Sequence, residues 1–308
     1  MSTFDSLSRS GYIKIIAHIG TLLTMVAWGT SFLSTKVLMV DGGFSPVEVF
    51  VYRFTLAYLL ILLLTFKKIL SNNWKDELQL LLCGMCAGSI YFVTENYALK
   101  FTSTGNVSLL GSISPLFTTI LIAVIYKVRI APPVILGSII AFAGVGCVVF
   151  SHGEGIEISP KGDLLALSAS LSWAIYAVAI KRLNPIYSSL FITRKLFFYG
   201  VVTALPLLFM QHAPLKIATL FDFGQLQYGL NFLFLVLICS VAAYLVLNES
   251  MKILGPVTAN NYLYLQPLVT MVAAYFILGE EIFPLGYVGC VMIIGGLVIS
   301  DKLKWKSK

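Results

Sequence analysis

Ten long runs of apolar residues constrain this chain more than any other feature of its sequence. Each run can cross the roughly 30 Å of hydrocarbon in a bilayer as an α-helix, which takes about 20 residues. Only 11% of the 308 residues are charged, whereas soluble domains carry about a quarter. The sequence predicts an all-α membrane protein with ten transmembrane helices, near residues 15–38, 45–66, 78–99, 103–126, 131–150, 163–182, 190–210, 226–250, 257–278 and 283–300.

The segments between these runs are short. None exceeds about fifteen residues, so we expect no soluble catalytic or regulatory domain. The first twelve residues carry no short apolar core followed by a small-residue cleavage site, so we expect no removable signal peptide. The first span should therefore remain in the mature protein.

Lysine and arginine lie mostly on one side of the predicted bundle. If both termini face the cytoplasm, sixteen of the 21 basic residues lie inside. Lys100, Lys161 and Lys216 then lie outside, while Lys36 and Arg53 lie within spans. Because cytoplasmic loops are enriched in Lys and Arg, we expect a multi-pass protein of a bacterial inner membrane with both termini cytoplasmic. The basic residues form no continuous basic face, which argues against a nucleic-acid partner.

The cysteines and histidines do not indicate a metal or a cofactor. All five cysteines lie inside apolar runs, where packing is the usual role of this residue. Cys83 and Cys86 form a C-x-x-C pair, but no second pair follows at zinc-site spacing. The three histidines lack metal-ligand spacing, and neither a phosphate-binding glycine loop nor a nucleophile elbow is present. We therefore expect no cofactor, no metal and no catalytic residue.

The chain contains an internal repeat. Trp28 and Lys36 of the first span recur in the sixth span at an offset of 145 residues. A second register, at an offset of 152 residues, relates Asn96, Lys100, Pro115, Leu116, Thr118, Gly137 and Gly144 to Asn248, Lys252, Pro267, Leu268, Thr270, Gly289 and Gly296. Because each unit has an odd number of spans, its second copy enters the bilayer from the opposite face. The sequence predicts two inverted five-helix repeats, residues 1–150 and 151–308, an architecture that favours transport over enzymology.

Five segments resemble a known family. They are AWGTSFLSTK at 27–36, SPVEVFVYRF at 45–54, YALKFTSTGNVSLLGSISPLF at 97–117, KGDLLALSASLSWAIYAVAIKRL at 161–183 and LGEEIFPLGYVG at 278–289. In order and spacing they are similar to the EamA family of the drug/metabolite transporter superfamily. The resemblance implies a ten-helix exporter of small metabolites such as amino acids, with a central cavity between the halves and no tightly bound cofactor.

The two halves differ from the family pattern in one respect. The family often places a Gly-Glu pair after the fourth span of a half, as Gly279 and Glu280 stand here after the ninth. The first half has Lys127, Val128 and Arg129 at that point. A role of this glutamate in one half therefore does not carry over to the other.

Two prolines at matched positions indicate a candidate binding site. Pro115 and Pro267 lie inside the fourth and ninth spans. Each removes the donor for the carbonyl four residues earlier, at Gly111 and Leu263. Helix breaks at corresponding positions of two repeats are typical of transporter sites, so these carbonyls are candidate ligands. The alternative is a packed kink in which a neighbouring Ser or Thr satisfies the carbonyl.

Polar and aromatic side chains inside the spans are further cavity candidates. Asn96 and Asn248 cost free energy in hydrocarbon unless they face a partner or a wet cavity, and an interhelical hydrogen bond is the alternative. Trp28 and Trp173 lie deep in their spans, away from the interfacial belt. Amphipathic and amide side chains complete the set, namely Tyr176, Tyr244, Tyr264 and Gln266. We expect these side chains around the two prolines near the midplane, with packing as the alternative for each.

Acidic residues near the spans are candidates for proton coupling. Glu95 or Glu249 could exchange a proton if buried, because burial favours the neutral form of a carboxyl group. Glu249 could instead pair with Lys252, one turn later. For Glu95 the favoured alternative is a self-neutralising cluster at the outer helix ends, formed by Lys36, Arg53, Glu95, Asp41 and Glu48.

These features favour a secondary transporter, an exporter that works by alternating access around a central cavity. Its partners would be a small-molecule substrate and the lipid bilayer, with proton or exchange coupling. The alternative is an intramembrane enzyme that acts on a lipid-linked substrate, for which the sequence supplies no acid, base or metal constellation. A passive pore would need a polar path along the whole lumen, and the polar residues here cluster near the middle and the rims.

Overall fold

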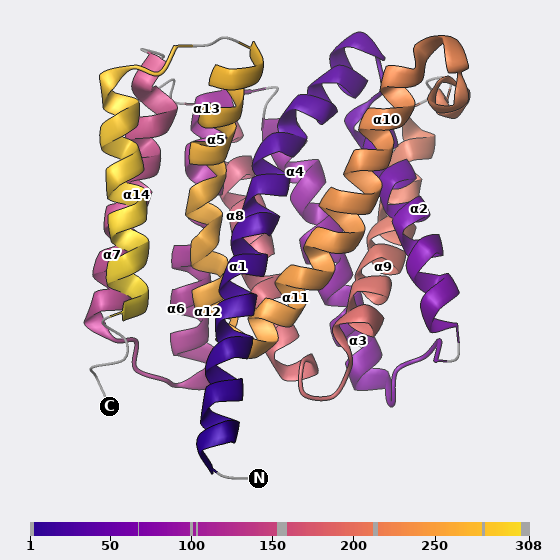
Figure 1. Cartoon of the computed structure of the whole chain (residues 1–308). Helices are drawn as coiled ribbons and strands as arrows, with labels where there is room; N and C mark the ends of the chain where they lie inside the picture. The colour runs from indigo at the N-terminus through magenta and orange to yellow at the C-terminus, as the bar shows by residue number, and fades with distance from the viewer. Residues whose placement is uncertain are drawn as a thin grey trace.

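The regular elements of the protein are helices throughout the part of the chain that the structure describes. The computed structural model describes residues 3–66, 68–98, 101–102, 104–152, 159–211, 215–278 and 281–302. Its α-helices (Figure 1) are α1 Thr3–Lys36, α2 Pro46–Thr65, α3 Trp74–Gly84, α4 Ile90–Ala98, α5 Thr104–Gly111, α6 Ser114–Tyr126, α7 Pro132–Val149, α8 Pro160–Leu183, α9 Ser189–Met210, α10 Leu226–Phe234, α11 Ala243–Leu254, α12 Pro256–Asn261, α13 Leu265–Leu278 and α14 Pro284–Lys302. Lys100, Gly279 and Glu280 lie outside the described residues.

Nine stretches of the described residues are long and apolar enough to cross a bilayer. The continuous helix predicted at 257–278 is wrong, because the chain divides there into α12, a 3-10 turn at Tyr262–Tyr264 and α13. Pro267 lies just after this turn and cannot donate to the carbonyl four residues earlier. The fourth predicted span is interrupted in the same way, between α5 and α6, just before Pro115. Both prolines thus follow a helix break.

Side-chain caps explain where several helices begin. Ser45 precedes α2 and its hydroxyl accepts from the Glu48 backbone N–H at 3.1 Å, while the Glu48 carboxylate accepts from the Ser45 N–H at 2.8 Å. This reciprocal capping box satisfies two N–H groups that have no partner inside the helix. Asn73 and Ser188 cap α3 and α9 through their side chains. The positions of these helix starts follow from local sequence alone.

Two helices change to π-helical geometry at matched positions. Met85–Ser89 joins α3 to α4, and Leu235–Ala242 joins α10 to α11. The 152-residue offset of the repeat maps the first segment onto positions 237–241, inside the second. In a π-helical turn hydrogen bonds span five residues instead of four, which leaves a backbone carbonyl free for other donors. Neither segment is expected from the sequence pattern.

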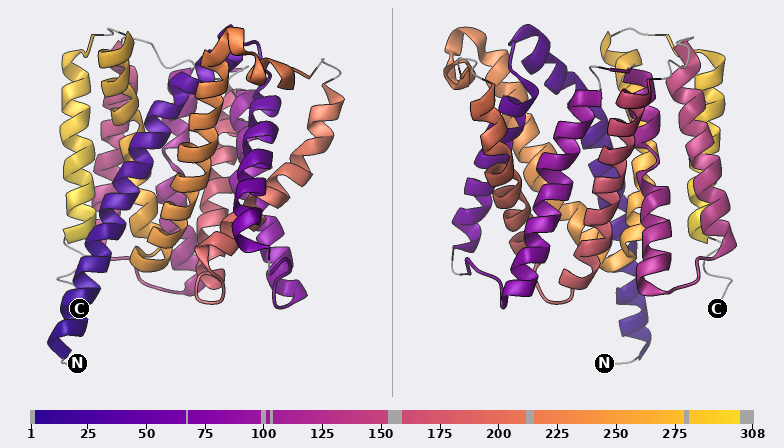
Figure 2. Two further views of the ribbon diagram at one scale, coloured as in Figure 1. Left: turned by 45° about the vertical axis from the view of Figure 1, so that its right-hand side comes forward. Right: turned by 180° about the vertical axis from the view of Figure 1, so that it is seen from behind.

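The helices pack in pairs in which one helix comes from the first half of the chain and the other from the second half. α1 packs on α11 and α13, and α8 packs on α4 and α6. α2 pairs with α9 and α7 pairs with α14, at opposite sides of the bundle (Figures 1 and 2). The beginning of α1 and the end of α14 lie at the same end of the molecule (Figure 1), which we call the terminus end.

Glycines allow the closest of these contacts. A Cβ atom added at Gly289 would lie 2.6 Å from the Gly144 carbonyl oxygen, and one at Gly296 would lie 2.5 Å from that of Gly137. Since an early glycine of α7 meets a late glycine of α14, the two helices run antiparallel. Gly84 of α3 allows a similarly close contact, because a Cβ there would lie 2.6 Å from the Cβ of Tyr199 in α9.

Candidate functional site

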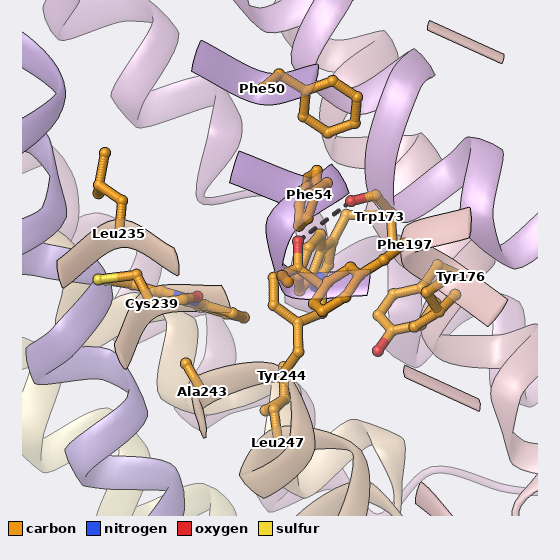
Figure 3. Close-up of a cluster of buried hydrophobic side chains, with 14 of the residues drawn as sticks. Phe50, Phe54, Trp173, Tyr176, Phe197, Leu235, Cys239, Ala243, Tyr244 and Leu247 are labelled. Atoms are coloured by element: carbon orange, nitrogen blue, oxygen red, sulfur yellow. Dashed lines mark hydrogen bonds between the residues drawn. The ribbon is translucent and has the colours of Figure 1, made fainter. Parts of the chain in front are cut away.

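Aromatic side chains from both halves of the chain fill the middle of the bundle. The Tyr244 ring lies 5.3 Å from Trp28 and 6.1 Å from Trp173, measured between ring centroids. It also lies 5.7 Å from Phe54 and 5.3 Å from Phe197. Figure 3 shows the Tyr244 ring between Phe54, Trp173 and Phe197. We call these five residues the central aromatic cluster, and edge-to-face contacts such as that between Trp28 and Trp173 stabilise it.

Backbone carbonyls of Met85–Ser89 and Leu235–Ala242, two of the three π-helical segments in the described residues, orient this cluster. The Tyr244 hydroxyl donates to the Ala87 carbonyl at 3.2 Å, and the Trp28 indole N–H donates to the Cys239 carbonyl at 2.8 Å. Ala87 and Cys239 occupy matching repeat positions, at the offset of 152 residues. The carbonyls freed for side chains at the centre therefore belong to the π-helical segments.

The carbonyls freed by the two prolines have partners within the protein. The Ser170 hydroxyl of α8 lies 3.2 Å from the Gly111 carbonyl oxygen and 2.6 Å from that of Leu110, so the two carbonyls share this donor. The Leu263 carbonyl accepts from the backbone N–H of Leu265. The first contact corresponds to the packed kink that the sequence left open as an alternative. A role for either carbonyl in binding substrate stays a prediction.

Two buried asparagines border the cluster. The Tyr176 hydroxyl donates to Asn248 Oδ1, and Asn248 Nδ2 donates to Thr193 Oγ1 at 2.8 Å. The Trp173 indole N–H donates to Asn260 Oδ1 at 3.1 Å, and the Asn260 amide donates to a threonine of α6. Asn248 and Asn260 are fully buried. Both amides therefore join helices of the bundle through interhelical hydrogen bonds.

The other predicted side chains have different surroundings. Asn96 of α4 and Gln266 of α13 are partly exposed. Tyr264 is fully buried beside Ser138 of α7, so it packs toward the α7 and α14 pair. The structure thus brings together at its centre the predicted residues Trp28, Trp173, Tyr176, Tyr244 and Asn248.

The charges predicted to neutralise one another do not pair. Arg53 Nε donates to Ser240 Oγ at 2.5 Å, and Arg53 Nη2 donates to the Cys239 carbonyl at 3.2 Å. Glu95 accepts from the Tyr91 hydroxyl at 2.8 Å. Arg53 instead faces a π-helical segment of the second half. Within the described residues no ion pair forms in the predicted cluster of Lys36, Arg53, Glu95, Asp41 and Glu48, and that prediction is wrong.

The second candidate for proton coupling is exposed. Glu249 lies near the end of α11, where its carboxylate accepts from the Ser189 hydroxyl at 2.5 Å. No ion pair joins it to Lys252 in the part of the chain described. Glu95 is partly buried, so of the two it better meets the condition of burial on which the prediction depends. Coupling through either residue stays a prediction.

Two ion pairs with buried carboxylates, not predicted from the sequence, lie at the terminus end. Lys195 of α9 pairs with Glu77 of α3, which also accepts from the Tyr199 hydroxyl. Arg182 of α8 lies 3.0 Å from Asp76, whose side chain is only 2% exposed. We call these the terminus-end ion pairs. A signal was present in the sequence, because two adjacent acidic residues that open an apolar run need partners.

A tyrosine hydroxyl also binds one of the terminus-end carboxylates. Tyr187, in the loop between α8 and α9, donates to Asp76 Oδ2 at 2.8 Å and accepts from the Asn72 backbone N–H at 2.7 Å. Burial and the adjacent carboxylate raise the pKa of the Tyr187 hydroxyl above its ordinary value. It therefore stays a neutral donor to Asp76.

A hollow lies away from the centre, at the terminus end. It has a volume of about 140 Å³ and lies between α7, α12 and α14. Its lining is mostly apolar and consists of Val134, Val257, Thr258, Asn261, Tyr262, Leu297, Val298, Ser300 and Asp301. His18 of α1 adjoins it, with Nδ1 2.8 Å from the Tyr262 hydroxyl and Nε2 3.8 Å from Asp301. This hollow does not coincide with the central cavity predicted from the sequence.

The chain is similar to known transporters over nearly its whole length. A model of the EamA-like transporter family matches residues 15–150 and 160–300. An "Uncharacterized transporter" of Clostridium kluyveri is 28% identical over 95% of this chain and 93% of its own length. A protein of Streptantibioticus cattleyicolor named "Probable terminal-alkyne amino-acid exporter" is 26% identical, over 91% of this chain and 92% of its own.

A solved crystal structure has the same fold. It covers 95% of this chain and 99% of its own, with a TM-score of 0.75 and 17% sequence identity. At that identity the likeness concerns the fold alone. The overall arrangement of the helices is therefore similar in the two proteins.

Proposed function

Because the chain belongs to the EamA-like transporter family, we propose that it is a secondary transporter that exports small metabolites such as amino acids by alternating access. The family and the named relatives are transporters, which overturns the alternative of an intramembrane enzyme. The relative named as an amino-acid exporter supports the substrate class.

The main support for this proposal is a pair of contacts between the two halves that the internal repeat relates to each other. Gly137 meets Gly296 and Gly144 meets Gly289, so each contact maps onto the other when both residues are shifted by the 152-residue offset. Antiparallel helices related in this way support a two-fold axis in the membrane plane and two inverted repeats, residues 1–150 and 151–308. With α12 and α13 counted as one broken span, each repeat has five transmembrane helices.

The central aromatic cluster is the proposed substrate site. Trp28 and Phe54 come from the first half, and Trp173, Phe197 and Tyr244 come from the second. A site at the meeting of two repeats is exposed alternately on either side when the halves rock against each other. Aromatic rings offer apolar surface, and the tyrosine adds a hydroxyl for a polar group of the substrate.

We further propose that the terminus end is cytoplasmic, in a bacterial inner membrane. In this orientation sixteen of the 21 basic residues lie inside, as the preference for cytoplasmic lysine and arginine predicts. Export is then movement from the terminus end to the opposite end.

Vesicle transport tests the proposal directly. Inside-out membrane vesicles from cells that overproduce the protein should accumulate one or more radiolabelled amino acids, with and without an imposed proton gradient to identify coupling. In liposomes that contain the purified protein, preloaded amino acid should drive saturable counterflow. Flux that rises linearly with concentration and shows no counterflow would indicate a pore, and absence of any flux with a broad metabolite panel would contradict transport of this class.

A further inference from the structure

Arg53 is a buried cation without a counter-ion. It lies inside α2, its residue is 7% exposed, and no carboxylate of the described residues lies within 4.0 Å of its guanidinium. Its partners are the Ser240 hydroxyl and the Cys239 carbonyl, both uncharged. A charge inside a membrane span is costly and usually marks a path or site for an ion or a charged substrate.

A second buried arginine makes the contrast clear. Arg194 is 2% exposed, and it donates four hydrogen bonds, to the Thr65 carbonyl and hydroxyl and to the carbonyls of Lys68 and Ile69. It therefore joins the loop after α2 to α9, a structural role. Among the described residues Arg53 makes two hydrogen bonds, and neither uses Nη1. Its guanidinium retains donors for a further partner.

Arg53 adjoins the central aromatic cluster. Its guanidinium carbon lies 5.6 Å from the centroid of the Phe54 ring. The Cys239 carbonyl that it binds also accepts from Trp28, and Cys239 lies beside the cluster in Figure 3. An anion bound to this guanidinium would therefore lie against the proposed substrate site.

An acidic group lies on the same site. Glu95 is partly buried and holds a hydrogen bond from Tyr91, whose ring centroid is 5.5 Å from that of Trp173. Glu95 and Arg53 form no ion pair with each other. A series of ring contacts links the two charges, from Phe54 beside Arg53 through Phe92 to Tyr91, which donates to Glu95.

We propose that Arg53 binds the carboxylate and Glu95 binds the ammonium group of the substrate, so that the transporter selects free amino acids over the corresponding acids and amines. A zwitterion supplies both missing counter-charges at once. A ligand with a single charge pairs with Arg53 or with Glu95 and leaves the other of these two side chains unpaired in a low-dielectric site. Such a ligand therefore binds with lower affinity than the zwitterion. The adjoining aromatic rings would receive an apolar side chain. This inference rests on the proposed transport function for its biological meaning.

Binding to the purified protein tests the inference separately from transport. Trp28 and Trp173 lie in the cluster, so their fluorescence reports occupancy. The protein amino acids would be screened first, and the one that binds best would be compared with its deaminated acid and its decarboxylated amine. We expect the amino acid to bind about tenfold or more tightly than either analogue, since each analogue lacks one charge-assisted interaction.

Two variants assign the charges. Arg53→Gln should weaken binding of the amino acid and the acid about tenfold or more and leave the amine unchanged, because an amide lacks the charge. Glu95→Gln should weaken binding of the amino acid and the amine and leave the acid unchanged. Lys216→Gln and Glu281→Gln, at the opposite end and in a loop, are matched controls and should behave as wild type. Arg53→Lys keeps the positive charge and provides a second test in case Arg53→Gln does not fold. It should bind the amino acid more tightly than Arg53→Gln does.

Several outcomes would overturn the inference. These are equal affinity for amino acid, acid and amine, unchanged binding in both variants, or a wild-type protein that transports another metabolite and binds none of the protein amino acids. If the protein binds amino acids as predicted but no vesicle preparation transports them, the inference stands and the proposed function fails. If transport is robust while Arg53→Gln and Glu95→Gln keep wild-type preference, the function stands and the inference fails.

Discussion

The two ends of the bundle join the halves of the chain by different chemistry. At the terminus end, Glu77 pairs with Lys195 and Asp76 pairs with Arg182, each across the halves. At the opposite end, the cross-half side-chain contacts found among the described residues include hydrogen bonds between carboxylates or hydroxyls and uncharged groups. They join Glu48 to the Lys216 backbone N–H at 2.9 Å, Ser45 to Gln211 at 2.7 Å and Asp163 to Thr102 at 3.1 Å.

The difference indicates which end is harder to open. Separation of a buried ion pair leaves two charges to be solvated, and a charge left buried without its partner costs several kcal/mol. Hydrogen bonds near solvent are exchanged for bonds to water at a net cost of about 1 kcal/mol each. If the halves rock as proposed and the terminus end opens, we expect the terminus-end ion pairs to separate, and so to stabilise the closed form of that end.

The largest expected effect concerns which end faces the cytoplasm. In a background without native cysteines, Asp222→Cys at the opposite end should react with an impermeant thiol reagent added to intact cells. Lys75→Cys at the terminus end should react only after the membrane is permeabilised. Both positions are exposed in the structure, so the bilayer alone should keep the reagent from Lys75→Cys in intact cells. Labelling of Lys75→Cys alone in intact cells would reverse the orientation and the direction of export.

A break in the more buried ion pair should produce the largest loss of stability. Lys195→Met leaves Glu77 buried without a cation, which should destabilise the protein by about 3 to 5 kcal/mol. Thermal unfolding of the purified protein in detergent, followed by fluorescence, measures this. The double variant Glu77→Leu, Lys195→Met removes both charges and should recover most of the loss. A single variant as stable as wild type would show that the pair does not hold this end together.

The second ion pair should have a smaller effect on stability and a clear effect on conformation. Arg182 is 50% exposed in its side chain, so its attraction to Asp76 is partly screened, and Asp76→Asn should cost about 1 kcal/mol. It should also favour opening of the terminus end. Cys83, which is fully buried in α3, should then react faster with a thiol reagent when it is the only cysteine present. The same single-cysteine protein with Lys216→Gln is the control. Equal labelling rates of Cys83 in the Asp76→Asn and Lys216→Gln proteins would argue that the ion pair does not keep the terminus end closed.

Much of this architecture could be predicted from the sequence, because apolar runs and prolines act locally. Nine of the ten predicted spans are present as stretches able to cross a bilayer. The remaining one, the ninth along the chain at 257–278, is broken before Pro267, as the fourth is before Pro115, since a missing backbone donor affects the helix wherever it lies. Gly144 and Gly289, found as repeat positions, meet where α7 and α14 approach closely.

The residues that define the site depend on contacts between distant segments, which the sequence pattern does not show. The change to π-helical geometry that frees the Ala87 and Cys239 carbonyls has no compositional signature here. Arg53 was expected to pair with acidic residues near its own span, yet its partners Cys239 and Ser240 are more than 180 positions away. Glu77 and Lys195 likewise meet only when the halves pack together.

The smallest effect is expected at the opposite end. Gln211→Ala removes the acceptor of the Ser45 hydroxyl, a contact exposed to solvent, so water can replace it and the loss of stability should be about 0.5 kcal/mol or less. This variant should leave Cys83 as unreactive as in wild type, because the ion pairs at the terminus end are intact. Thermal unfolding and the Cys83 labelling rate together measure both effects. A Gln211→Ala protein destabilised as much as Asp76→Asn would show that the two ends hold the halves with equal strength, and the comparison would then give no reason for the terminus end to be the harder one to open.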